Sequence, residues 1–121
     1  GGGGKLKAGE TARAAAKREV KEEIEVDVTL AEPQGRIHFH DPGGKEWLVH
    51  VFRTEEYQGE PRETEEMRPQ WWPVEAIPYD QCWADDRVWL PRLIQGKKFE
   101  AEVWLADDGS LQKHAVKELP A

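Results

Sequence analysis

The segment 10–24 constrains the fold most strongly, because it is built from strong helix formers and contains neither glycine nor proline. On the predicted helix, Glu23 falls inside the apolar stripe, Glu19 lies at its edge and Glu22 flanks the pair. A carboxylate on the buried side of a helix is costly unless it is paired or binds a metal. These three acids can converge on a hard divalent ion such as Mg²⁺. The alternative is a solvated face of ion pairs such as Arg18 with Glu22.

Other local patterns predict one further helix and several strands. Thr11 is the expected N-cap of the first helix. Alternating apolar and polar residues predict antiparallel strands at 26–30, 35–40 and 46–52, and a hairpin around the turn 107–110. The remaining segments predict a short strand and an acidic loop in 55–66, a strand at 69–74, and a helix at 85–94 that Pro91 breaks or kinks.

Length and charge exclude several classes of protein. The chain has 121 residues, which suits one small domain, and no apolar run is long enough for a membrane helix. Its net charge of −7 disfavours binding to polymeric nucleic acid. The single cysteine, Cys82, excludes an intrachain disulfide and is interpreted as a small half-buried side chain rather than a nucleophile.

The glutamates belong to a longer pattern with fixed spacing. The pattern is glycine, five residues, glutamate, seven residues, then Arg-Glu-aliphatic-any-Glu-Glu-any-Gly-aliphatic. Eight of its nine defined positions agree, namely Gly4, Glu10, Arg18, Glu19, Val20, Glu22, Glu23 and Val26. The chain thereby resembles the Nudix hydrolases. The departure is Glu25, where the family has a glycine that closes the helix in a left-handed conformation, so we expect strain or a different helix exit there.

Similarity continues beyond this box, in stretches such as VHVFRTEEYQGEP, EEMRPQWWPVEAIPYD and CWADDRVWLP. These resemble the MutT-type branch of the family, which hydrolyses oxidised purine nucleoside triphosphates. The resemblance implies an α/β Nudix fold, a mixed β-sheet flanked by helices, formed as a single domain over residues 1–121 with the box at about 4–26. It also implies that the strand and a half before the glycine loop is missing, so the fold is expected to be N-terminally truncated.

The resemblance also implies an activity. We expect Mg²⁺-dependent hydrolysis of triphosphates such as 8-oxo-dGTP and 2-hydroxy-dATP to the monophosphate and pyrophosphate, with Mn²⁺ as the alternative ion. The expected partner is a small-molecule nucleotide, the expected state a monomer in the cytoplasm, and the expected role nucleotide-pool sanitation and prevention of DNA damage. Two alternatives stay open: a Nudix pyrophosphatase for another nucleoside diphosphate-X substrate, and a fragment that binds nucleotide or metal without turnover.

Site residues follow from the resemblance, position by position. The implied metal ligands are the Gly3 carbonyl and the carboxylates of Glu19, Glu22, Glu23 and Glu66. Glu22 is the first choice for the catalytic base and Glu66 the second. Gly2, Gly3 and Gly4 would let the backbone approach the phosphates, and Lys5 would lie near them or remain solvated. Arg18 is expected to hold glutamates by ion pairing rather than to touch substrate.

The base-binding residues are implied in the second half of the chain. Trp83 would stack on the purine, Asp85 and Asp86 would bond its edge, and Met67 and Trp89 would line the pocket. Adjacent acids can share a proton, so one can donate while the other accepts. The alternative for Asp85 and Asp86 is that they are simple helix N-terminal acids. Other aromatic and imidazole side chains are interpreted as core or strand residues: Trp71, Trp72, Trp104, His38, His40, His50 and His114.

Overall fold

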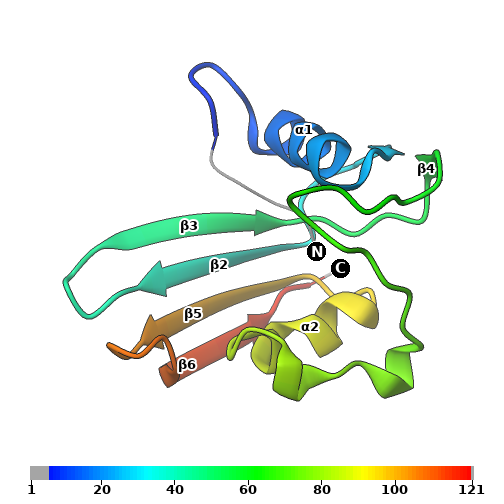
Figure 1. Ribbon diagram of the computed structural model, residues 1–121. Helices are drawn as coiled ribbons and strands as arrows, with labels where there is room; N and C mark the ends of the chain where they lie inside the picture. Colours follow the sequence, from blue (N-terminus) through cyan, green and yellow to red (C-terminus); the bar gives the residue numbers. More distant parts are fainter. Residues whose placement is uncertain (1–5, 121) are drawn as a thin grey trace. The chain divides into compact units, whose positions relative to one another are not determined.

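The computed structural model describes residues 6–120 and follows most of the predicted element order (Figure 1). The chain divides into two units, each described by itself. The first unit contains the described residues up to 32 together with 52–71, and the second contains 33–51 and the described residues from 72 onward. The prediction of one domain over residues 1–121 stays a prediction.

The first unit is organised around helix α1 (Ala12–Ile24). Thr11 is its N-cap, as predicted, because the Thr11 hydroxyl accepts a hydrogen bond from the Ala14 N–H at 3.1 Å. The helix ends at Glu25, whose φ of 61° and ψ of 34° are left-handed, and the Glu25 N–H donates to the Lys21 carbonyl. Glu25 therefore keeps the conformation that the family's glycine adopts, and it bears the steric cost of that conformation.

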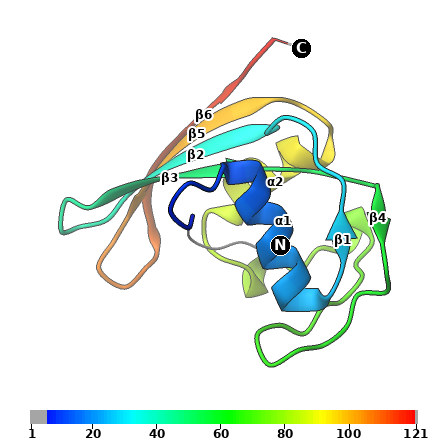
Figure 2. The same ribbon diagram turned by 90° about the horizontal axis from the view of Figure 1, so that it is seen from above.

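Two short strands complete the first unit. Strands β1 (Asp27–Val28) and β4 (Tyr57–Gln58) pair antiparallel beside the helix (Figure 2). The predicted strand at 26–30 is thus reduced to two residues. Beyond these paired residues, the Thr54 hydroxyl links the same two segments by donating a hydrogen bond to the Thr29 carbonyl at 2.7 Å.

The second unit is a four-stranded mixed sheet with the strand order β3-β2-β5-β6 (Figure 1). Its strands are β2 (Gly35–His40), β3 (Glu46–Val51), β5 (Phe99–Leu105) and β6 (Leu111–Glu118). The pairs β2–β3 and β5–β6 are antiparallel, as the sequence predicted, whereas β2 and β5 are parallel. Parallel neighbours need a long crossover connection, and here it contains helix α2 (Asp86–Ile94).

One face of this sheet carries the hydrophobic core. Ile37, Phe99 and Val103 are fully buried there, and Leu93 of α2 joins the same cluster. Successive strand residues alternate between faces, so the opposite face carries polar side chains such as His38 and those that neighbour it. The helix side and the polar side of the sheet are therefore chemically distinct.

The predictions for the segment 69–74 and for its tryptophans were wrong. Residues 69–74 form no strand, since Pro69 and Pro73 lack the amide donor that a strand ladder needs; the 3-10 turns Val74–Ala76 and Tyr79–Gln81 follow instead. The tryptophans of that segment, expected in the core or on a strand, are exposed, Trp71 by 75%. Of the break or kink predicted at Pro91, the break does not occur, because α2 continues to Ile94 and Leu93 packs into the core.

Candidate functional site

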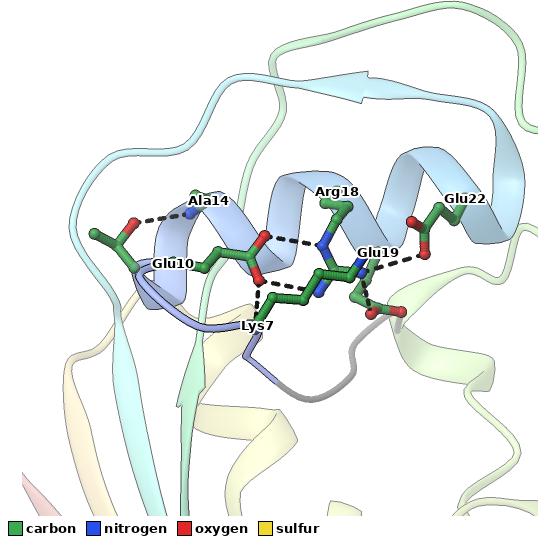
Figure 3. A network of polar contacts seen from close by, with 7 residues as sticks. Lys7, Glu10, Ala14, Arg18, Glu19 and Glu22 are labelled. Atoms are coloured by element: carbon green, nitrogen blue, oxygen red, sulfur yellow. Dashed lines mark hydrogen bonds and ion pairs between the residues drawn. The ribbon is translucent and has the colours of Figure 1, made fainter.

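A network of charged side chains lies along α1 and centres on Arg18 (Figure 3). The guanidinium binds Glu10 in a bidentate manner, with Nε at 2.8 Å from Oε2 and Nη2 at 3.0 Å from Oε1. Its Nη1 also reaches Glu19 Oε1 at 2.6 Å and Glu22 Oε2 at 3.3 Å. The predicted ion-pairing role of Arg18 is confirmed by these contacts.

The same network sets the charge state of its members. The hydrogen bonds from the Arg18 side chain, followed by that from the backbone of Lys7, lower the pKa of Glu10 to about 2. The carboxylates of Glu10 and Glu19 in turn raise the pKa of Arg18. Both groups are therefore charged across the physiological pH range, and the guanidinium stays fixed against the face that carries the glutamates.

Glu23 is the most enclosed acid of α1, with 7% of its surface exposed. Its burial agrees with its predicted place inside the apolar stripe. Glu19 and Glu22 lie on the same helix, and Arg18 engages one oxygen of each of their carboxylates. Each of these carboxylates also has a second oxygen, which is a potential ligand atom for a positive group.

The loop that carries Glu66 is tied to the end of the same helix. The Arg62 N–H donates to the Ile24 carbonyl at 3.0 Å, and the Thr64 hydroxyl donates to the Glu23 carbonyl. Thr64 then shapes the loop, since its hydroxyl accepts from the Glu66 N–H at 3.2 Å. These contacts explain how a residue more than forty positions away in sequence returns to the glutamate-rich helix.

The second unit holds four of the five residues predicted to bind the base, namely Trp83, Asp85, Asp86 and Trp89. Asp85 is buried, with 9% exposed, and it accepts a hydrogen bond from the Trp89 indole N–H at 2.9 Å. Trp89 stacks against the core residue Phe99, with ring centroids 6.0 Å apart. Trp83 is 80% exposed, and its carbonyl accepts from the Asp86 N–H at 3.0 Å.

The two aspartates are not equivalent. Burial, and then the neighbouring charge of Asp85, raise the pKa of Asp86 above its usual range. Asp85 meanwhile is held as an acceptor by the Trp89 indole. A pair in which one acid keeps its proton to higher pH can present a donor and an acceptor side by side, which suits the edge of a purine.

Several predicted residues lie outside this description. Gly2, Gly3, Gly4 and Lys5 precede residue 6 and so fall outside the described residues. Met67 lies in the first unit, where its carbonyl accepts from the Thr64 N–H at 2.9 Å. Cys82 is partly buried, and its thiol contacts the Pro78 carbonyl at 3.4 Å, in keeping with a structural role. Among residues 6–120, no helix is long and apolar enough to cross a membrane.

Sequence reasoning missed one group of ligand side chains. His38 and His40 were interpreted as ordinary strand residues because no third ligand was evident, yet Glu102 meets both of them. The only sequence signal was the alternation of His38 and His40, which places both on one face. Within the described residues, this histidine–glutamate group brings its ligand atoms within 4.8 Å of one another, as a metal site requires. The carboxylates of α1 are the donor type that hard divalent ions prefer.

Comparisons with known proteins bear on this arrangement. A model of the NUDIX domain matches residues 2–93. The oxidized purine nucleoside triphosphate hydrolase of Danio rerio is 46% identical over 100 residues, which cover 82% of this chain and 64% of that protein. The chain thus spans slightly less than two thirds of that relative. The protein of the same name from Mus musculus is 38% identical over 120 residues, covering 98% of this chain and 77% of that protein.

The fold has a close structural counterpart. The crystal structure of the mutator MutT protein from Bacillus halodurans matches with a TM-score of 0.81 and 23% identity, covering 96% of this chain and 80% of that one. This likeness shows the fold, an α/β class with a mixed sheet and two helices, as predicted.

Proposed function

The chain belongs to the NUDIX domain family, and from that membership we propose that it hydrolyses oxidised purine nucleoside triphosphates to the monophosphate and pyrophosphate. Two relatives carry the name oxidized purine nucleoside triphosphate hydrolase, which supports this substrate class. The observation that carries the proposal is the unequal pair Asp85 and Asp86: the Trp89 indole holds Asp85 as an acceptor, and the raised pKa of Asp86 favours the protonated form that could donate to an oxidised purine edge.

The proposed metal-binding set is Glu19, Glu22, Glu23 and Glu66, together with the Gly3 carbonyl. The described part of this set fits a hard divalent ion, since all its donors are carboxylate oxygens and Glu23 is a buried acid. Magnesium is the proposed ion, with manganese as the alternative. Bound there, such an ion would offset the repulsion between carboxylates and triphosphate and polarise the phosphate oxygens.

The protein's own residues would then position the reaction. Arg18 holds Glu19 and Glu22 on one side of α1, so these ion pairs fix the positions of the two carboxylate groups. Glu22 is the more exposed of the two, which favours it as the base that accepts a proton from the attacking water. Glu66 is the second candidate, because the Thr64 contacts return its loop to the end of the helix. The proposed phosphate contacts are Gly2, Gly3, Gly4 and Lys5.

The purine would be bound by residues of the second unit. Trp83 presents an exposed ring for stacking, and the Asp85–Asp86 pair presents its hydrogen-bonding groups. Trp89 holds the Asp85 carboxylate in place and is proposed to line the pocket. Met67, a residue of the first unit, stays a proposed base-binding residue by the family resemblance alone. The raised pKa of Asp86 favours its protonated form, and a proton shared with Asp85 would let one site accept both the 8-oxoguanine and the 2-hydroxyadenine patterns.

The remaining assignments are proposals of the same kind. We propose a single domain over residues 1–121 that acts as a monomer in the cytoplasm on a small-molecule nucleotide, with neither polymeric nucleic acid nor membrane as a partner. The net charge of −7 supports the first exclusion, because a surplus of acid repels a phosphate backbone.

A substrate panel tests the proposal. The values of kcat/KM for 8-oxo-dGTP, 2-hydroxy-dATP, dGTP and ADP-ribose are measured side by side with Mg²⁺, and we expect the two oxidised purines to be preferred. Asp86→Asn replaces the titratable carboxyl by an amide whose NH2 always donates and whose carbonyl always accepts, so no proton can be exchanged with Asp85. The ratio between the two oxidised substrates should therefore shift about tenfold, the value of one hydrogen bond. Asp80→Asn, a nearby exposed acid, is the matched control. Equal turnover of dGTP and 8-oxo-dGTP would refute the proposed specificity.

A further inference from the structure

The polar face of the second unit's sheet carries two histidines and two glutamates that the proposed hydrolysis does not use. Strand β2 lies between β3 and β5 (Figure 1), and the strand register brings the four residues together. His38 is directly opposite Glu102 on β5, and His40 is directly opposite Glu46 on β3. The cluster is therefore built from three neighbouring strands, which are rigid elements on which to position ligands.

The two imidazoles are close to each other and share both carboxylates. Their ring centroids are 4.3 Å apart. Glu102 Oε2 lies 2.6 Å from His40 Nε2 and 3.6 Å from His38 Nδ1. Glu46 Oε1 lies on the other nitrogen of each ring, 2.8 Å from His38 Nε2 and 3.3 Å from His40 Nδ1. Each ring thus faces one carboxylate with one nitrogen and the second carboxylate with the other.

Metal-bound histidines commonly use their nitrogens in this way: one binds the ion and the other is hydrogen-bonded to a carboxylate. One ligand atom from each of His38, His40 and Glu102 lies within 4.8 Å of the other two. Tetrahedral zinc, with bonds of about 2.1 Å, places its ligand atoms about 3.4 Å apart, so modest rotations of the side chains bring all three within bonding distance. Glu46 can then accept hydrogen bonds from the remaining ring nitrogens, which is how carboxylates commonly orient metal-bound histidines.

The surroundings supply further support. His40 stacks on Trp104 with ring centroids 4.7 Å apart and an interplanar angle of 3°, so its ring plane is fixed. His38 and Glu102 also line an open hollow of about 390 Å³, which gives an ion and its water access to the cluster. The two carboxylates bring negative charge to the cluster, which a divalent cation would offset.

We propose that His38, His40 and Glu102 bind a divalent transition-metal ion such as Zn²⁺, and that Glu46 orients the two imidazoles. Imidazole ligands favour zinc and neighbouring transition metals, whereas oxygen-only sets favour magnesium. The site is therefore chemically distinct from the all-carboxylate set on α1. Its three protein ligands leave a fourth position for water or another small ligand.

Calorimetric titration of the metal-stripped full chain with Zn²⁺, in excess Mg²⁺ to occupy the all-oxygen sites, tests the proposal. We expect one zinc ion per chain. His40→Gln or Glu102→Gln should weaken its binding at least about 100-fold, and Glu46→Gln about tenfold, as loss of an orienting carboxylate does. His50→Gln is the matched control, since His50 lies on the same face of β3 opposite Arg36 and outside the cluster. It should bind zinc as the wild type does.

Histidine ring signals in the NMR spectrum of the wild-type chain keep the test independent of how well the variants fold. Addition of Zn²⁺ alone should shift the ring signals of His38 and His40 and leave those of His50 and His114 in place. The proposal would be overturned by zinc affinity that is unchanged in both His40→Gln and Glu102→Gln, or by His38 and His40 signals that do not respond to zinc.

Discussion

Replacing Gly35 with alanine should destabilise the sheet strongly. A Cβ atom at Gly35 would lie 2.2 Å from Phe99 Cζ, with two further ring carbons at 2.4 and 2.6 Å. Ordinary carbon contacts are about 3.5–4.0 Å, so the ring or the strand must move by more than an ångström. Phe99 is 0% exposed, and Gly35 is paired on both sides, to Val51 and to Phe99. The Phe99 ring therefore has no solvent-exposed side towards which it can move.

The expected cost lies at the upper end of the range for overpacking, about 3 kcal/mol. For a chain of 121 residues, each kcal/mol corresponds to about 4 °C in Tm. Gly35→Ala should therefore lower Tm by about 12 °C, measured by circular dichroism at fixed pH and scan rate.

Two further variants separate the steric clash from a general effect of alanine. Gly43→Ala meets only the Asp41 carboxylate at an ordinary 3.5 Å, so its Tm should stay within about 2 °C of the wild type. Phe99→Leu removes part of the opposing ring, so in the Gly35→Ala background it should cost less than it does alone. A Gly35→Ala chain that melts with the wild type would refute the close packing of β2 against Phe99.

Three other perturbations have equally definite outcomes. Because the pKa of Glu10 is lowered from 4.5 to about 2, its stabilising effect is complete above pH 4.5 and is lost as pH falls towards 2. The difference in Tm between the wild type and Glu10→Gln should therefore disappear between pH 4.5 and 2. A constant difference would contradict the Arg18 contact. Glu25→Gly relieves a left-handed residue with φ of 61°, so urea denaturation should show a gain of about 0.5–1 kcal/mol, and a loss would show that Glu25 is not strained. Since the pKa of Asp86 is raised, the affinity for 8-oxo-dGTP should weaken as pH rises and Asp86 loses its proton. The affinity of Asp86→Asn should vary less with pH, and identical pH profiles of affinity in the two proteins would exclude a shared proton.

Local chemistry made the helix and the hairpins predictable. Thr11 and the run of helix formers predict α1, and the Asp-Gly turn predicts the β5–β6 hairpin. The prediction failed at 69–74, where the apolar residues resembled a strand but Pro69 and Pro73 could not donate to one. Aromatic content alone does not distinguish a strand from an exposed loop.

Contacts between distant residues could not be predicted from local patterns. His38 and Glu102 are neighbours only because β2 and β5 pair in parallel, and the register of a parallel pair is set by a long crossover rather than by a turn. Likewise, the Thr64 hydroxyl that ties the Glu66 loop to α1 has no signal in the sequence around it. The resemblance to the Nudix hydrolases supplied Glu66 as a candidate ligand, and the structure supplied the contacts that return its loop to the helix.

The release of pyrophosphate from 8-oxo-dGTP by the wild type and by Glu23→Gln tests the central claim most directly. We expect Mg²⁺-dependent release by the wild type and a loss of at least about 100-fold in Glu23→Gln, because a buried amide replaces an anionic oxygen donor. Glu32→Gln, whose partner Arg13 lies at the surface, should keep wild-type turnover. Turnover by Glu23→Gln at the wild-type rate would contradict the assignment of the α1 glutamates to metal-dependent hydrolysis.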